Sequence, residues 1–251
     1  MRILIGLLIG GLLAAQPAFD VASVKPTTPD GIGCTVLTYP GGRVTIHNCT
    51  ALYIMEQAFD EEKVVIPGAP AWTNDERYDI DARPPAGSEA SKANPFVRKL
   101  PPNEEQRQML QTLFADRFQM KFHRETKEEN VYLLTASKSL KLTESANPKE
   151  YPWAGSVAGG AFSGDGIAGM NITMPQLAKR LTKVMARPVL DRTELAGAWD
   201  FKYPYAANVG ERPDLVSSLI ASLNAIGLKL ESSKAPVERI VVDRLEKPTP
   251  N

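Results

Sequence analysis

The sequence predicts an α+β fold of two similar halves, each with helices on one side of a β-sheet, and a β-hairpin near the N-terminus. Three observations predict it. Helix-like segments carry one apolar stripe and strand-like segments alternate apolar and polar residues, which is the pattern of elements packed in two layers. These segments follow one another in the same order in 43–136 and in 173–242. Two cysteines, Cys34 and Cys49, flank the segment with hairpin character.

Residues 1–15 have the character of a signal peptide. Met1-Arg2 is a short basic start, and Ile3 to Ala15 is an unbroken run of apolar residues and glycine. A helix that stays in a membrane needs about 20 apolar residues, and this run is shorter. We expect an exported protein, periplasmic or secreted, that meets a membrane only through 1–15 before cleavage after Ala15. An uncleaved anchor is the alternative.

Cys34 and Cys49 are predicted to form a disulfide across the N-terminal hairpin. Segments 35–38 and 43–47 are β-prone, and Gly41-Gly42 suits a two-residue turn. A turn centred there places the two cysteines directly opposite each other, at the separation that a disulfide needs. In an oxidising compartment the bridge would contribute about 3 kcal/mol. Two unrelated buried thiols are the alternative.

The first predicted half spans 16–146. After the hairpin its segments are a helix from the cap Thr50 through Phe59, a strand at 77–82, a helix at 104–116, and strands at 118–122 and 131–136. Prolines and small polar residues fill 83–102. Because proline lacks an N–H and interrupts helices and strands, that stretch is predicted to be a surface loop.

The second predicted half spans 170–251. Its segments are a helix from the cap Thr173 through Met185, a strand at 198–203, a helix at 214–226, and strands at 228–230 and 237–242. Thr173 and Gln176 form a capping-box pattern. Similar tripeptides, Tyr78-Asp79-Ile80 and Trp199-Asp200-Phe201, support an internal duplication.

The segment between the halves, 147–169, is rich in glycine and carries Tyr151, Trp153 and Phe162. Glycine-rich segments act as flexible linkers, whereas loops on a rigid scaffold often carry binding residues. Two interpretations stay open. The segment is a linker, or its three aromatic residues form a binding loop.

The residue inventory contains no convincing catalytic or metal site, and no cofactor is expected. His47 and His123 lack metal-ligand spacing and are interpreted as surface histidines. No Gly-x-Ser-x-Gly motif occurs, and Ser163 lies in a glycine-rich turn that only imitates one. The 29 basic residues balance 29 acidic ones, which argues against nucleic-acid binding, because that needs a basic excess.

Carboxylates are the remaining candidates for acid–base chemistry. Two of Asp79, Asp191 and Asp200 at glycosidase separation, about 5–10 Å, would make the protein an extracytoplasmic hydrolase. Alternation along the strand places Asp79 and Asp81 on one face, opposite the apolar residues beside them. A solvated strand edge is therefore the simpler interpretation.

Ordered blocks along most of the mature chain resemble a known family. The blocks are Phe19 to Pro26, Pro70 to Trp72, Glu76 to Ile80, Met109 to Gln111, Ala115 to Phe118, Lys121 to Thr126, Met174 to Ala178, Arg187 to Asp191, Gly227 to Glu231 and Lys234 to Glu238. They resemble the soil-associated acidobacterial family of exported proteins built on a domain of unknown function, related to domains fused to BlaR-type sensor peptidases. Each half is also faintly similar to the short N-terminal domains of secretins and TonB-dependent receptors. The resemblance implies an extracytoplasmic sensing or interaction role.

The sequence therefore predicts a non-enzymatic exported module that binds an envelope protein, peptide or glycan, or senses a ligand. Its expected surfaces are the 83–102 loop, the 151–169 segment and strand edges, since an unpaired edge can accept an added strand. An extracytoplasmic hydrolase that uses an acidic pair is the alternative.

Overall fold

The chain forms two compact units. The computed structural model describes residues 16–28, 33–60, 64–92, 102–146, 152–159, 161–204 and 214–248, and the predicted signal peptide lies outside them. Unit 1 is Met1–Thr126 with Glu238–Asn251, and unit 2 is Lys127–Val237. The mixture of helices and strands confirms the α+β class. Within the described residues, no helix has the length and apolarity that a bilayer span requires.

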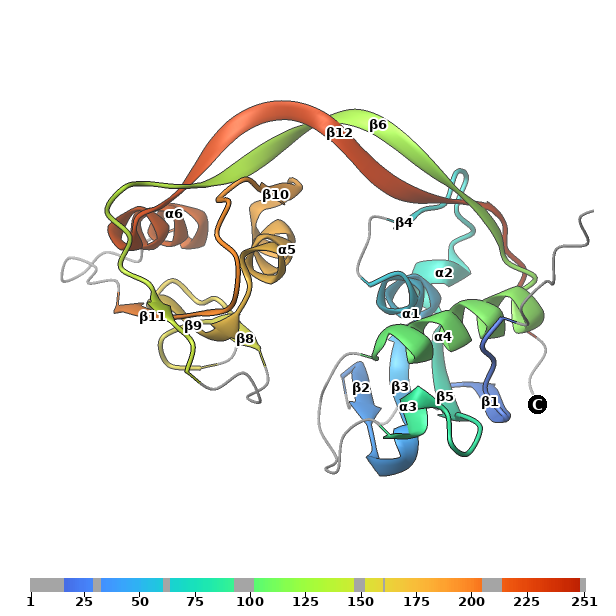
Figure 1. Ribbon diagram of the computed structural model, residues 1–251. Coiled ribbons are helices and arrows are strands. Elements are labelled where there is room, and N and C mark those ends of the chain that lie inside the picture. The colour runs from blue at the N-terminus through green and yellow to red at the C-terminus, as the bar shows by residue number, and fades with distance from the viewer. Residues whose placement is uncertain are drawn as a thin grey trace, which may run out of the picture. The chain divides into compact units, whose positions relative to one another are not determined.

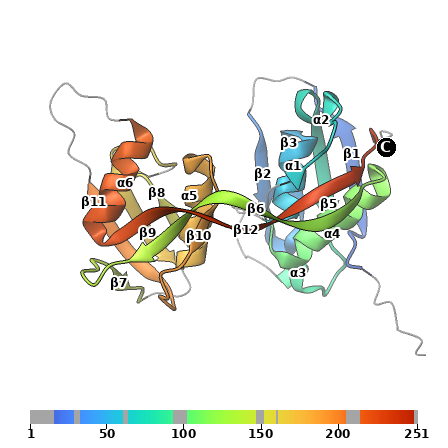
Figure 2. The same cartoon turned by 90° about the horizontal axis from the view of Figure 1, so that it is seen from above.

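Unit 1 is built on a four-stranded antiparallel sheet in the order β1-β5-β3-β2 (Figures 1 and 2). Its strands are β1 (Val21–Pro26), β2 (Thr35–Thr38), β3 (Val44–Thr50) and β5 (Arg77–Arg83). Its helices are α1 (Ala51–Ala58), α2 (Trp72–Asp75), α3 (Glu89–Lys92) and α4 (Glu104–Arg117). The apolar sides of α1 and α4 pack on one face of the sheet and form its core.

Side chains fix where α1 and α4 of unit 1 begin. Thr50 Oγ1 accepts a hydrogen bond from the N–H of Tyr53 at 3.3 Å and caps α1, as predicted. Asn103 and Gln106 form a capping box at the start of α4. Gln106 Nε2 also donates to the carbonyl of Gly42 at 2.8 Å, which ties α4 to the hairpin. These bonds satisfy N–H groups that have no partner within the helix.

The predicted disulfide between Cys34 and Cys49 is present, with the Cα atoms 4.6 Å apart. The predicted hairpin register, however, is wrong by one residue, because Thr35 pairs with His47. The expected two-residue turn is instead a short 3-10 segment, η1 (Pro40–Gly42).

A β-bulge explains how the disulfide forms in this register. The pairing of β3 with β5 shifts between Ile46 and Cys49, and Asn48 lies between them with a φ of 54°. Asparagine tolerates this left-handed conformation better than most residues. The N–H of Asn48 donates to Asp79 Oδ1 at 2.9 Å, which holds the bulge in place.

Unit 2 is built on a second antiparallel sheet, in the order β7-β11-β9-β8. Its strands are β7 (Thr143–Glu144), β8 (Trp153–Gly155), β9 (Gly166–Ile172) and β11 (Trp199–Pro204). The helices α5 (Met174–Met185) and α6 (Leu215–Ile226) pack on one face of it. The predicted capping box of Thr173 and Gln176 is present at the start of α5. Asp214 caps α6.

The two sheets share their strand order and the register of their central pair. In unit 1, Ile46 lies opposite Ile80, and the corresponding pair in unit 2 is Gly169 opposite Phe201. The adjacent pairs follow in step, and the pairing of β11 with β9 shifts just before Phe201, where the bulge of unit 1 has its counterpart. The units therefore repeat one structural plan, while an origin by duplication stays a prediction.

Two long strands stand where the sequence predicted four short ones. β6 (Lys121–Ala136) and β12 (Leu228–Arg244) are uninterrupted hydrogen-bonded neighbours, and each begins in one unit and ends in the other. Their middle residues are mostly exposed and polar, so only the strand ends carry an apolar pattern. Ile240 and Val242 of β12 lie in the core of unit 1, where β4 (Val64–Val65) pairs with that strand in parallel. In unit 2, β10 (Val189–Asp191) pairs in parallel with β6.

The predicted boundaries at 146 and 170 do not coincide with the two units. The predicted linker 147–169 contains β8 and the first residues of β9, both of which belong to the sheet of unit 2. The 83–102 stretch is not entirely a loop, because Glu89–Lys92 forms α3 and the N–H of Ala90 donates to the carboxylate of Glu105. Residues 93–101 lie outside the described residues.

Candidate ligand-binding site

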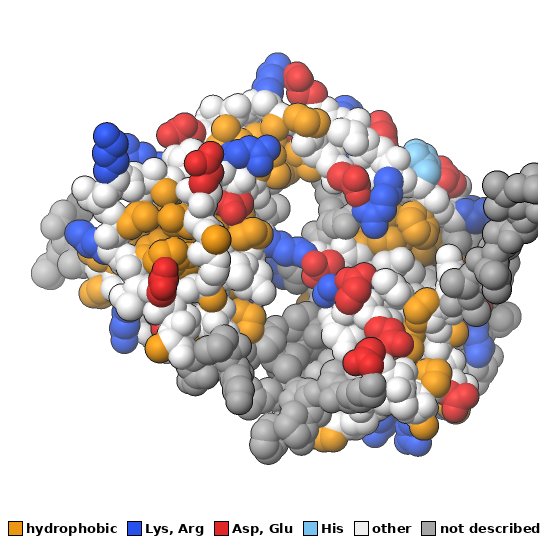
Figure 3. Space-filling model, in the orientation of Figure 1, with side chains coloured by type: hydrophobic (Ala, Val, Ile, Leu, Met, Phe, Trp, Pro, Cys, Tyr) orange, Lys and Arg blue, Asp and Glu red, His pale blue; other side chains and the backbone are white. Residues whose placement is uncertain are grey.

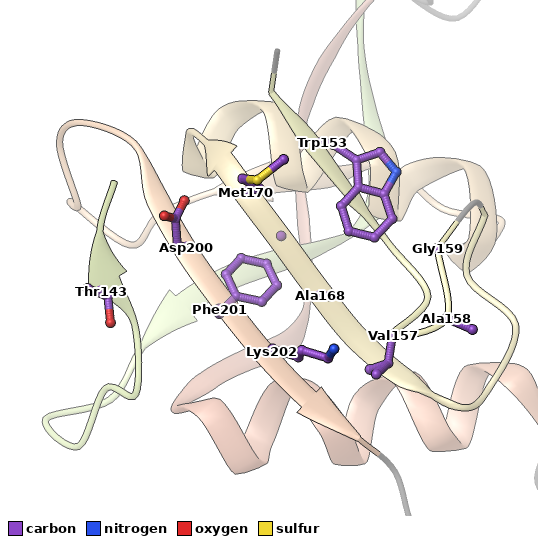
Figure 4. A pocket seen from close by; sticks show the side chains of 11 residues that line it. Thr143, Trp153, Val157, Ala158, Gly159, Ala168, Met170, Asp200, Phe201 and Lys202 are labelled. Atoms are coloured by element: carbon purple, nitrogen blue, oxygen red, sulfur yellow. The ribbon is translucent and has the colours of Figure 1, made fainter. Parts of the chain in front are cut away.

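An open hollow of about 570 Å³ lies on the sheet of unit 2. Its lining comes from β7, β8, β9 and β11 and from the turn at 157–159 (Figure 4). Trp153 and Met170 lie at one end of it, and Lys202 and Val157 lie at the other. The site is therefore assembled from residues that are up to 59 positions apart in the chain, between Thr143 and Lys202.

Strand pairing explains which side chains reach the hollow. Trp153 lies opposite Met170, and Ala168 lies opposite Lys202. Directly paired residues point to the same side of an antiparallel sheet, and residues two apart on a strand share a face. These four residues therefore share the face that α5 and α6 leave uncovered. Met170 is 42% exposed there, although large apolar side chains are usually buried.

Small residues form the floor of the hollow. Ala168 lines the hollow with only a methyl group, two residues from Met170 on β9. Gly169 has a different role, because a Cβ at this position would lie 2.4 Å from Cζ of Phe201 and 3.0 Å from Cγ2 of Ile172. Only glycine allows the Phe201 ring to lie under the strand at this point, so the floor stays shallow and apolar.

A hydrogen-bond network holds the turn at one end of the hollow. The carboxylate of Asp165 accepts hydrogen bonds from Ser156 Oγ at 2.7 Å, from the N–H of Ala158 at 3.0 Å and from Ser163 Oγ at 3.0 Å. The bond from Ser156 is the main reason that the pKa of Asp165 lies below its ordinary value. The charged carboxylate thus fixes the turn that carries Val157.

Two charged residues of β11, Asp200 and Lys202, line the hollow. Asp200 Oδ1 accepts a hydrogen bond from the N–H of Asn171 at 2.7 Å, so this carboxylate supports the backbone. Lys202 is exposed, and its amine makes no hydrogen bond or ion pair with any residue in the described ranges. Lys202 is therefore the charge at this site that a ligand can use.

The predicted binding loop contributes one of its three aromatic residues to this site. Trp153 lines the hollow. Phe162 is half-buried and packs against the core of unit 2, and Tyr151 lies outside the described residues. Sequence reasoning missed Met170 and Lys202, because their positions on one face become visible only when the register of β9 with β11 is known.

The corresponding face of unit 1 is polar and internally paired. Arg43 Nε and Nη2 donate to the two carboxylate oxygens of Asp81 at 2.8 and 2.6 Å. This pairing is the main reason that the pKa of Asp81 lies below its ordinary value. The Nδ1 of His47 lies 3.0 Å from Oδ1 of Asp79. β5 is a central strand, so the predicted solvated edge at Asp79 and Asp81 is wrong.

The acidic residues considered for hydrolysis accept hydrogen bonds from backbone and side-chain groups. Asp79 accepts from Thr27 Oγ1 at 2.8 Å as well as from the bulge N–H. Asp191 Oδ1 accepts from the N–H and the Oγ1 of Thr193 at 2.9 and 2.8 Å. His123 pairs with Asp243 on an exposed surface. Among the described residues, no group of three or more His, Cys, Asp or Glu side chains is arranged to hold a metal ion.

Basic and acidic side chains are interspersed over the surface shown in Figure 3, and neither sign gathers into a large patch there. Hydrophobic side chains are also visible between them on both units. This distribution agrees with the zero net charge of the chain.

Comparison with known proteins identifies a family without assigning an activity. Residues 53–245 match the family model described as Protein of unknown function (DUF3738). No curated protein and no solved structure matches the chain. The matched range includes most of α1, all of α2 to α6 and every residue that lines the hollow. The chain belongs to the DUF3738 family.

Proposed function

We propose that this protein is an exported, non-enzymatic binding module that takes a small ligand in the hollow of unit 2. The observation that carries the proposal is the hollow itself. Its volume of about 570 Å³ falls in the range of small-molecule sites, roughly 300–1,000 Å³. Trp153 and Met170 supply apolar surface, and Lys202 supplies one polar group, which is the composition typical of such sites.

The contrast between the two units supports a binding role for this face. At the positions that Ala168 and Lys202 occupy in unit 2, unit 1 has Thr45 and Asp81, and Asp81 is neutralised by Arg43. The shared plan therefore does not require an apolar hollow. In unit 1 the corresponding strands carry a polar face, on which Arg43 pairs with Asp81.

The disulfide supports export. Cys34 and Cys49 are bonded to each other, and structural disulfides persist in oxidising compartments. This agrees with the predicted signal peptide at 1–15 and with a periplasmic or secreted protein that meets an envelope ligand. Fusion of residues 1–15 to a phosphatase that is active only outside the cytoplasm tests this part. An inactive fusion beside an active control with an established signal peptide would contradict export.

Binding is tested on the exported protein with N-phenyl-1-naphthylamine, a neutral apolar probe whose fluorescence rises in apolar sites. We expect saturable binding that Trp153→Ala weakens about tenfold or more, because aromatic side chains supply much of the contact area in such sites. Tyr53→Ala is the matched control, since Tyr53 is a 38% exposed aromatic residue on α1 of unit 1. Equal binding by the wild type and both variants would sink the proposal.

A further inference from the structure

We infer that the ligand of the unit 2 hollow is an amphipathic anion, with a ring or short apolar part on Trp153 and Met170 and its anionic group at Lys202. This inference rests on the proposed function and adds the chemical class of the ligand. It depends on three features of the site: an apolar end, a cation that has no partner among the described residues, and a carboxylate that already accepts a hydrogen bond from the backbone.

The apolar end is set by Trp153 and Met170. They are directly paired on β8 and β9, so their side chains lie next to each other on the open face (Figure 4). A tryptophan ring beside a polarisable thioether favours planar or apolar ligand groups. The small side chain of Ala168, two residues from Met170 on β9, leaves the space that such a group would fill.

The cation lies at the other end. Lys202 is two residues after Asp200 on β11, and Figure 4 shows its amine nitrogen near Val157. In unit 1 the charges on the corresponding face are paired, as Arg43 is with Asp81. The amine of Lys202 has no such partner among the described residues, so an anion bound there would meet a cation that is free to pair.

The carboxylate of Asp200 does not lie at the end of the hollow where Lys202 would bind the anionic group. Asp200 Oδ1 is occupied by the N–H of Asn171, and the Asp200 side chain lies toward Met170, away from the Lys202 amine (Figure 4). Its negative charge disfavours an anion at the Trp153 and Met170 end. The two charges therefore orient the ligand, with its anionic group directed toward Val157 and its apolar part toward Met170.

A matched pair of probes tests the ligand class on the exported protein. The neutral probe N-phenyl-1-naphthylamine and its sulfonated relative 1-anilinonaphthalene-8-sulfonate differ in one anionic group. We expect the sulfonate to bind more tightly than the neutral probe. Lys202→Gln should weaken the sulfonate about threefold to fivefold, the size of an exposed ion pair, and should leave the neutral probe unchanged. Lys229→Gln, an exposed lysine on β12, is the matched control and should change neither probe.

Salt and a second variant separate the possible outcomes. Because exposed ion pairs are screened, added salt should weaken the sulfonate in the wild type but not in Lys202→Gln. If both probes bind at Trp153 but Lys202→Gln leaves the sulfonate unchanged, the anionic class is overturned while the proposed function stands. If Trp153→Ala leaves both probes unchanged, the hollow is not the site and both proposals fail.

Discussion

The backbone N–H of Asn171 donates a hydrogen bond to Oδ1 of Asp200 at 2.7 Å, and Asn171 adopts a left-handed φ of 49°. The same relationship joins Asn48, at φ 54°, to Asp79 at 2.9 Å. Each asparagine lies one or two residues before the end of its strand, which leads into a capped helix. One carboxylate in each unit therefore sets the bulge that directs the chain from the sheet into its helix.

Removal of the Asp200 carboxylate should destabilise unit 2. Asn171 is buried, and Asp200→Ala would leave its N–H without its acceptor, at a cost of about 1–3 kcal/mol. Urea denaturation followed by hydrogen exchange in β9 measures this loss. Glu231→Ala is the control, because Glu231 accepts an exposed hydrogen bond from Thr135, whose loss should cost below about 1 kcal/mol. Equal losses in the two variants would contradict the role of Asp200.

Gly169→Ala should strain the floor of the hollow. The added methyl group would lie 2.4 Å from Cζ of Phe201, and we expect a destabilisation of about 1–3 kcal/mol from overpacking. Phe201→Leu in the same chain should recover part of this loss, since leucine removes the ring carbons that the methyl group meets. Gly33→Ala is the control, as nothing lies within 4 Å of a Cβ there. The absence of any rescue in thermal unfolding would refute this contact.

The helix starts and the disulfide were predictable because their causes are local. Thr50 and Thr173 cap helices with bonds to residues three positions later, and Cys34 and Cys49 flank a single hairpin. The two long strands, β6 and β12, were not predictable in this way. The exposed middle of β6 has no apolar period, and its partner β12 lies over one hundred residues away, as the ion pair of Arg124 with Glu238 illustrates. The hollow also depends on strand register, because the pairing of β9 with β11 places Lys202 on the face that carries Met170.

The turn beside the hollow should loosen in acid. Hydrogen bonds, the largest from Ser156, hold the pKa of Asp165 below its ordinary value. Its stabilising effect is therefore complete above the ordinary carboxyl range and is lost as the pH falls through the lowered pKa. The exchange of the Ala158 amide, after correction for the intrinsic pH dependence, should show less protection as this carboxylate gains its proton. Asp165→Asn should remove most of the pH dependence, and an unaltered profile in that variant would rule out Asp165 as its cause.

Reduction of the disulfide should weaken unit 1 selectively. Cys34 and Cys49 are separated by 15 positions, and closing a loop of that length contributes about 3 kcal/mol. Hydrogen exchange with and without a reductant should speed up in β3 and stay unchanged in β9. The double variant Cys34→Ala with Cys49→Ala should show the same pattern and become insensitive to the reductant. A uniform response of both units would contradict this prediction.

A substitution near the C-terminus should destabilise the N-terminal unit. Ile240 is fully buried in the core of unit 1, so Ile240→Ala should cost about 2–5 kcal/mol there and leave β9 protected. Ile226→Ala is the matched variant, since Ile226 is buried in the core of unit 2 and should give the reverse pattern. Exchange rates in β3 and β9 distinguish the two. Loss of protection in β9 upon Ile240→Ala would show that the cores are not separate.

The core of unit 1 is completed by residues far along the chain. Ile240 and Val242 lie in the core that contains Cys49, so the segment that is synthesised first cannot close its interior until these two residues have been made. Unit 2, whose residues 127–237 are contiguous, can close earlier. Folding during synthesis would therefore complete unit 2 before unit 1, although residues 16–126 are made first.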